Sequence, residues 1–472
     1  MVVTKSLAQT GGTLYSRTKI DSKLLWGIGA GLFFGLLFGL LPVEASSPFI
    51  IFVVGLFLGL LWVGHYDATE KTQLMTLFLG AYLSRAFFSL LFYLLSFTYQ
   101  DAAHVGFLFL NDGWAYHEDA FRMVKMRQFG FDPLAYGTSI WSSGKPIFPV
   151  PYEHWNSYVY AVTGKSPMAM FMLNSLFGAL TVLVLYDLVR YIFDKKAALR
   201  AAMIYAYWPS LILWSTQNLK DPMTIFFFTL MISSLLILFR RPSVLRIASL
   251  GVATIALYHL QKFYIMVSVS MALLVYFVTL KIHKHFWMRV LWAFILFACV
   301  AIVASQLITK TFSLATLTKW QNTFIRDLMS EHEIFFQSNF ESLNALRQVR
   351  ATGGSAFLSR LDISSPLSLL FSAPLLFLFV CFGPFPWQVT SFFKIFGVAE
   401  MLVFYSFMPA FLRGVQDVFR NETRTALLLL SVTFIMMMSI ALLDANLGTA
   451  FRHRSGILAF VFTFIAVGWE KR

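Results

Sequence analysis

The sequence predicts an all-α fold, a polytopic transmembrane helical bundle of about twelve spans with extracytoplasmic loops. Composition is the first reason: 58% of the 472 residues are hydrophobic and only 13% are charged, whereas soluble domains carry about 25% charged residues. The second reason is that apolar runs of about 20 residues, the length of a membrane-crossing helix, recur along the chain. The third is that Lys and Arg gather in alternate loops.

The apolar runs divide the chain into four parts. Residues 1–72 hold a basic N-terminus and two spans, 73–307 hold seven spans, 308–394 form an outer segment, and 395–472 hold three spans. The first run exceeds a signal-peptide core and lacks a cleavage site, so we expect a retained anchor. The predicted spans are 24–42, 48–64, 73–97, 167–190, 199–216, 222–240, 244–261, 263–281, 286–307, 395–412, 424–443 and 456–469.

Basic loops orient the bundle. The N-terminus and the loops at 194–200, 240–246 and 281–289 fall on one side if each span is counted once. The positive-inside rule makes that side cytoplasmic. The expected outer loops are 98–166, 217–221, 259–262 and 308–364.

The apolar run 366–383 contains Pro366 and Pro374, which disfavour a straight helix. As a re-entrant or interfacial segment, it leaves the basic stretch 413–424 in the cytoplasm and 446–454 outside. We adopt that arrangement, which keeps both termini cytoplasmic.

The net charge of +14 would suggest nucleic acid in a soluble protein. Here basic loops that set topology and lie near anionic lipid headgroups explain it, so the bilayer is the expected partner and nucleic acid is not. Cys299 and Cys381 lie in apolar runs and form neither a disulfide framework nor a metal site.

The stretch NDGWAYHEDA opens the first outer loop with Asp112, Tyr116, His117, Glu118 and Asp119. Asp112, Tyr116 and Asp119 share one face if this segment is helical. A carboxylate there is suited to act as a general base or to ligate a divalent cation. Capping of a helix N-terminus is the alternative, although it accounts for Asp112 and not for the rest.

The other outer loops are short and also polar. Lys220 and Asp221 could face the same outer cavity, or Asp221 could cap a helix that begins with Pro222. His259 and Lys262 lie in the turn YHLQK, where snorkelling of the lysine is the simpler explanation.

The segment NLGTAFRHR ends in Arg452, His453 and Arg454. Arginine suits phosphate binding, so we expect a phosphate site, unless the topology is inverted and these residues are cytoplasmic. Arg85 and Glu400 lie within predicted spans, where charges often have a function, but nothing in the sequence pairs them.

With these motifs the chain resembles the GT-C superfamily, membrane glycosyltransferases that use polyprenyl-phosphate-linked sugars. It is most similar to the bacterial branch that includes protein O-mannosyltransferases and the aminoarabinose transferase. The resemblance rests on the D-x-x-x-Y-H pattern at Asp112, on Lys220-Asp221 and on YHLQK, and it covers 73–307, the seven-span module. Two extra spans precede that module, and Gly113 replaces a second acidic residue, which counts against a metal requirement and a protein acceptor.

The resemblance implies roles for single residues. Asp112 would be the catalytic carboxylate that activates the acceptor, and Asp221 a second acidic group. Lys220, Arg452 and Arg454 would bind the lipid phosphate. Tyr116, His117, Glu118, His259 and Lys262 are the remaining candidate substrate-binding residues. The sequence assigns no cofactor with certainty, and a divalent cation is the one cofactor that it leaves open.

We therefore expect a glycosyltransferase (a hexosyltransferase of GT-C type) in a bacterial inner membrane. It would move sugar from a polyprenyl-phosphate donor to an extracytoplasmic glycan, lipid or protein acceptor. One alternative is a polymerase or ligase of polyprenyl-pyrophosphate-linked glycans. Another is a transporter or flippase, although transporters gather polar residues near the bilayer midplane and often show repeated halves.

Overall fold

The computed structural model describes residues 42–131, 151–261 and 361–470 with few gaps, and scattered positions within 264–273 and 344–358. Every secondary-structure element within these ranges is a helix, so the predicted all-α class is confirmed. The elements are α2 (Val43–Val63), α3 (Ala68–Tyr99), α4 (Asp112–Gln128), α6 (Pro151–Thr163), α7 (Pro167–Ile192), α8 (Lys195–Tyr207), α9 (Pro209–Ser215), α10 (Asp221–Leu238), α11 (Val244–Leu260), α17 (Pro366–Phe382), η1 (Pro386–Gln388), α18 (Phe392–Asn421), α19 (Thr423–Leu443), α20 (Leu447–Arg454), η2 (Ser455–Ile457) and α21 (Leu458–Trp469).

Seven helical stretches of the described chain are long and apolar enough to cross a membrane. This is a multi-pass membrane protein, although the total of about twelve spans is not tested, because 24–42 and 286–307 lie outside the described residues and 263–281 lies largely outside them.

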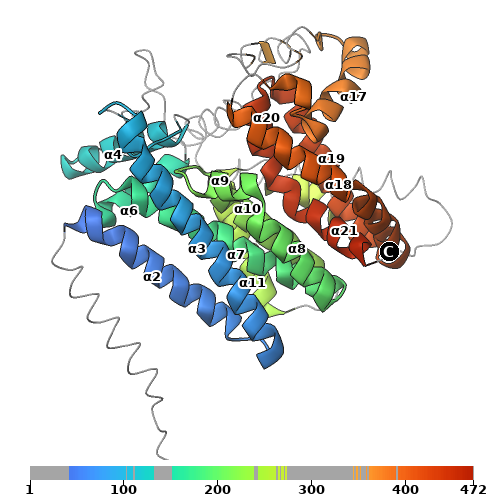
Figure 1. The fold of residues 1–472 in the computed structure, drawn as a ribbon, viewed down its shortest axis with the longest axis horizontal. Coiled ribbons are helices and arrows are strands. Elements are labelled where there is room, and N and C mark those ends of the chain that lie inside the picture. Colours follow the sequence, from blue (N-terminus) through green and yellow to red (C-terminus); the bar gives the residue numbers. More distant parts are fainter. Residues whose placement is uncertain are drawn as a thin grey trace, which may run out of the picture.

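Helix α7 is the centre of the bundle and packs against α2, α3, α8 and α10 (Figure 1). In its most apolar window 78% of the residues are buried, against 28% in α2, which lies at the edge. A helix that is apolar on every side must be covered on every side, either by protein or by lipid. The burial difference therefore makes α7 a core helix and α2 a lipid-facing one.

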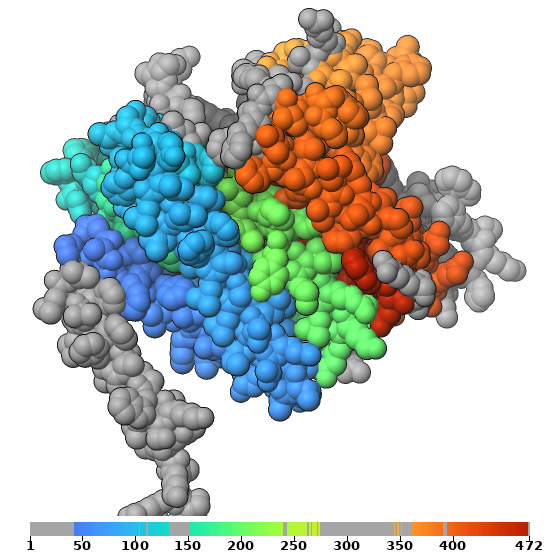
Figure 2. Space-filling model, in the orientation of Figure 1, coloured from blue at the N-terminus to red at the C-terminus, as the bar shows by residue number. Residues whose placement is uncertain are grey.

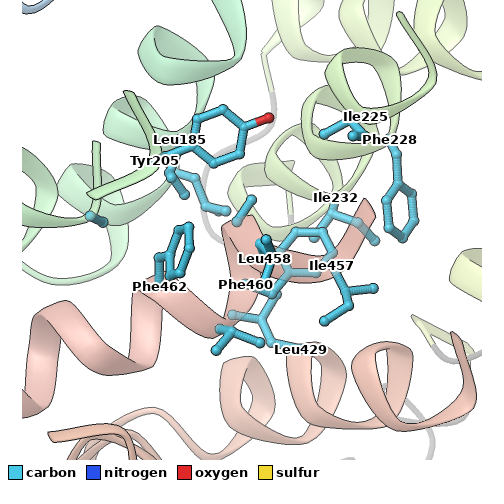
Figure 3. Packing of buried hydrophobic residues seen from close by; sticks show 14 of the residues in the cluster. Leu185, Tyr205, Ile225, Phe228, Ile232, Leu429, Ile457, Leu458, Phe460 and Phe462 are labelled. Atoms are coloured by element: carbon cyan, nitrogen blue, oxygen red, sulfur yellow. The ribbon is translucent and has the colours of Figure 1, made fainter. Parts of the chain in front are cut away.

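The C-terminal helices form the other side of the molecule (Figure 2). Helices α18 and α21 approach closely at Gly414 and Gly468, where a Cβ on Gly414 would lie 1.8 Å from the Phe464 carbonyl oxygen. Small residues permit such contacts between membrane helices. Helix α21 also packs on α8, where Phe462 lies edge-on to Tyr205 within the buried cluster of Figure 3.

Two segments differ from the sequence-based expectation. The predicted span 199–216 is broken into α8 and α9, because Pro209 lacks an N–H and forces Trp208 into an extended conformation (φ −69°, ψ 123°). The predicted outer loop 446–454 is mostly helix α20, which continues through η2 into α21. The doubtful run 366–383 is α17, whose 17 residues fall short of the roughly 20 that a straight span needs.

Candidate functional site

An arginine between two carboxylates forms the centre of the site. The Arg452 Nη2 donates to Asp112 Oδ2 at 2.8 Å, and its Nε lies 3.5 Å from Asp221 Oδ2. The side chains of Arg452 and Asp221 are each 12% exposed, and that of Asp112 is 41% exposed. The cluster is therefore largely shielded from solvent and opens at Asp112.

The three residues come from three helices far apart in sequence. Asp112 is the first residue of α4, Asp221 is the first residue of α10, and Arg452 lies in the last turn of α20. Carboxylates are stabilised at helix N-termini, so Asp112 and Asp221 also suit the starts of their own helices. Because Arg452 contacts Asp112, residues 446–454 lie at the same end of the bundle as the first outer loop, which argues against the inverted topology.

A buried amide network joins the two acidic segments. Asn218 Nδ2 donates to the carbonyl of Gly113 at 3.1 Å, beside Asp112. Asn218 Oδ1 accepts from Tyr152 Oη at 3.0 Å and from Asn156 Nδ2 at 2.9 Å. Asn218 and Asn156 are fully buried. The loop before Asp221 is thus fixed to the start of α4.

The same loop is held from beneath by α7. Asn174 Nδ2 donates to the carbonyls of Gln217 and Leu219 at 2.5 and 2.8 Å. Residues 216–220 are all buried, which is unusual for a loop, because its polar backbone groups must find partners inside the protein. These bonds provide such partners.

His117 lies in the same helix as Asp112 but has a different environment. Its Nδ1 lies 2.6 Å from Tyr160 Oη, and the ring is buried. Burial, and secondarily the nearby Lys165, lowers the pKa of His117 to about 3. Burial also raises the pKa of Tyr160, so the tyrosine hydroxyl donates to a neutral imidazole. His117 is therefore neutral at physiological pH.

The other predicted residues of α4 also have partners. Glu118 pairs with Lys165 at 2.8 Å, and buried Asp119 lies 3.9 Å from Arg122. The Tyr116 ring packs edge-on against Tyr152, with ring centroids 5.2 Å apart. Asp112 accepts a bond from Arg452, and Tyr116 packs against the residue that supports Asn218.

Three predicted residues remain, namely Lys220, His259 and Lys262. Lys220 precedes Asp221 and is 8% exposed. His259 is exposed near the end of α11, with its ring edge-on to Tyr258. Lys262 lies outside the described residues.

Arg454 contacts the end of α17 and not the Asp112–Asp221 pair, while its expected role in phosphate binding stays a prediction. Its Nη1 donates to the carbonyls of Val380, Cys381 and Gly383 at 3.2, 3.2 and 2.8 Å. These groups lie at the C-terminal end of α17, where the helix leaves carbonyls without partners. Arg454 therefore caps α17. Residues two apart on a helix point in different directions, which explains why Arg452 faces the carboxylates while Arg454 faces α17.

Metal-ligating types do not converge in the described part of the chain, where no three His, Cys, Asp or Glu side chains could hold one ion. Asp112 and Asp221 are the available oxygen ligands, and in this arrangement Arg452 lies between them. The donor set does not fit a divalent cation so long as that arginine remains in place.

Sequence reasoning missed Asn218, Asn156 and Asn174. Asn218 lies beside Lys220 and Asp221, but an asparagine in a loop is usually a solvated turn residue, whereas Asn156 and Asn174 lie within α6 and α7, and only their buried positions reveal their roles. The adjacent amides Gln217 and Asn218, in a short loop between two apolar runs, were the signal that could have found Asn218.

These features define a multi-pass, all-helical membrane protein with a charged cluster at one end. A family model described as dolichyl-phosphate-mannose-protein mannosyltransferase matches residues 150–308. The match bears out the resemblance to the GT-C superfamily; it includes Lys220 and Asp221 but neither Asp112 nor Arg452.

The solved structures that are similar to this chain include two oligosaccharyltransferase structures. The archaeal oligosaccharyltransferase AglB from Archaeoglobus fulgidus, in complex with an inhibitory peptide and a dolichol-phosphate, has 16% identity and a TM-score of 0.47 over 85% of this chain and 50% of that one. The apo Archaeoglobus fulgidus oligosaccharyltransferase has 16% identity and a TM-score of 0.39, over 82% and 50%. The chain spans about half the length of these proteins, and no curated protein matches it.

Proposed function

We propose that this chain transfers a sugar from a polyprenyl-phosphate donor to an extracytoplasmic acceptor. The observation that carries the proposal is the contact of Arg452 with both Asp112 and Asp221. Transfer needs a base for the acceptor hydroxyl and a cation for the departing phosphate, and this cluster holds both kinds of group.

In the proposed reaction the donor phosphate binds Arg452, with Lys220 as a second cation. The acceptor hydroxyl gives its proton to Asp112 while its oxygen forms a bond to the sugar C1. The bond between C1 and the phosphate oxygen breaks, and its electron pair leaves with the polyprenyl phosphate. Asp221 holds Arg452 from the other side. No step in this reaction passes through a metal ion.

The distribution of charge supports an extracytoplasmic site. Arg190 and Lys195 pair with Glu70 at 2.9 and 2.8 Å where α7 ends and α8 begins. The end of α7 at Ile192 is 18 residues beyond Asn174, which corresponds to about 27 Å along the helix. Because basic residues mark the cytoplasmic end, the Asp112 cluster belongs at the outer end. A bacterial inner membrane remains part of the proposal.

The test uses purified protein in lipid nanodiscs with a panel of radiolabelled polyprenyl-phosphate sugars and a crude pool of glycan, lipid and peptide acceptors. Wild type, Asp112→Asn and the control Asp101→Asn are compared. Asp101 is in the same outer loop, but its side chain is 68% exposed and pairs with His104. Transfer by wild type and by the control, with at least ~10²-fold less by Asp112→Asn, is expected.

Equal transfer by all three proteins would keep the enzyme class and remove Asp112 from the mechanism. Transfer only from polyprenyl-pyrophosphate-linked glycans would favour the polymerase or ligase. No transfer from either donor class would overturn the proposed function.

A further inference from the structure

The break between α8 and α9 separates groups that would be paired in a continuous helix. In such a helix the Ser210 N–H would bond to the Ala206 carbonyl. Here the Ser210 N–H donates to Glu400 Oε2 at 2.7 Å, and the Ala206 carbonyl accepts from Arg85 Nη1 at 2.8 Å. Glu400 thus provides an acceptor for the Ser210 N–H, and Arg85 provides a donor for the Ala206 carbonyl. Together they replace the backbone hydrogen bond that a straight helix would form between Ser210 and Ala206.

Glu400 does more than accept one bond. It also accepts from Ser210 Oγ at 2.8 Å and from Trp208 Nε1 at 2.7 Å, so donors on both sides of Pro209 converge on one buried carboxylate. Hydrogen bonds to a charged acceptor are stronger than neutral ones, and backbone groups without partners are costly in a membrane. Glu400 therefore stabilises the bent conformation and not a straight helix.

Arg85 acts from the opposite side. It is fully buried, and it also donates to the Ala81 carbonyl at 2.9 Å. Room for it depends on Gly178 of α7, where a Cβ would come within 2.8 Å of Arg85 Nε. The buried Arg85 guanidinium, which fits beside Gly178 and bonds to the free Ala206 carbonyl, indicates that the α8–α9 break is a stable feature of the fold.

The break leads directly to the site. Helix α9 ends at Ser215, and the buried loop 216–220 then brings the chain to Asp221. Glu400 fixes the start of this segment, and Asn174 and Asn218 fix its loop. If α8 and α9 formed one straight helix, the path to Asp221 would change.

We propose that Glu400 is a positioning residue which, with Arg85, holds the α8–α9 break and through it sets the position of Asp221. The placement of Asp221 is independent of the proposed function, and only its effect on turnover rests on that function.

The test is Glu400→Gln in the full chain in nanodiscs. A glutamine has one carbonyl oxygen in place of two carboxylate oxygens, so it cannot accept all three bonds. Hydrogen exchange followed by mass spectrometry should become faster in 208–221 and stay unchanged in α19. Glu470→Gln is the matched control, because Glu470 pairs with Lys196 and Arg200 only at 3.8 Å.

Turnover gives the second readout. Glu400→Gln should lower kcat by ~10- to 100-fold with little change in KM for the donor, because misplacement by about 1 Å has effects of this size. In an Asp221→Asn background the same change should have a much smaller effect. Unchanged exchange in 208–221, faster exchange throughout the protein, or fully additive effects on kcat would each overturn the proposal. If wild type transfers no sugar, the proposed function fails and the exchange data alone decide.

Discussion

The ion pair between Asp112 and Arg452 gives a prediction in which turnover and donor affinity change in different directions. Arg452 donates to Asp112, so in the proposed reaction the donor phosphate must compete with Asp112 for the arginine. Asp112→Asn removes this competing charge but keeps an oxygen that can accept from the arginine. We therefore expect turnover to fall by ~10²-fold while donor affinity stays equal or becomes tighter.

The size of the second effect follows from the geometry. Unit charges about 4 Å apart interact by about 4 kcal/mol at an effective dielectric constant of about 20. The Asp112 side chain is 41% exposed, and exposed ion pairs contribute about 1 kcal/mol or less after screening. Because 1.4 kcal/mol corresponds to a factor of ten, about 1 kcal/mol corresponds to a factor of about five, and the donor should bind up to ~5-fold more tightly.

The assay pairs donor binding, measured by titration of a non-reacting polyprenyl-phosphate sugar analogue, with single-turnover transfer. Asp101→Asn should match wild type in both. Weaker donor binding by Asp112→Asn together with normal turnover would refute the reasoning, because Asp112 would then hold the donor and not activate the acceptor.

Three further predictions concern the surroundings of this pair. Arg452→Met should weaken donor binding by ~10- to 100-fold in the same titration, because it removes charge-assisted hydrogen bonds of about 1.5–3 kcal/mol; unchanged affinity would exclude the phosphate role. Asn218→Ala should lower the melting temperature in detergent and reduce transfer, because it leaves the Gly113 carbonyl and two donors buried without their partner, at about 1–3 kcal/mol each; an unchanged melting temperature would contradict the network. His117 has a folded-state pKa of about 3, below its ordinary 6.5, so its contribution to stability is complete above about pH 6.5 and is lost as the pH falls toward 3. His117→Gln should flatten that part of the melting-temperature profile, and a profile like that of wild type would show that other groups cause the acid sensitivity.

The hydrophobic runs were sufficient to predict the class of fold. Runs such as 73–97 and 424–443 correspond to α3 and α19, because a long apolar segment in a bilayer has few alternatives to a helix. The loops were harder. Pro209 lies inside a run of suitable length, and hydropathy does not report that its neighbours would find partners in Arg85 and Glu400, from distant helices.

The site was predicted in part. Asp112, Asp221 and Arg452 were candidates separately, and the structure brings them together, while their roles stay predictions. Arg454 has the same chemistry as Arg452 but faces α17, and helical phase cannot be assigned to a segment that is expected to be a loop. The amide network was missed because burial, which decides whether an asparagine is structural, depends on helices elsewhere in the chain.

Asp112 and Arg452 are separated by 340 positions, so the site depends on the order of synthesis. When α4 and α10 leave the ribosome, their carboxylates have no Arg452, and α8 lacks its packing partner α21. The charged cluster can form only after α20, which carries Arg452, has been made. A chain that stalls earlier would have both carboxylates and Lys220 but not Arg452, so under the proposed function we expect incomplete products to bind the donor phosphate weakly and to consume little lipid-linked sugar.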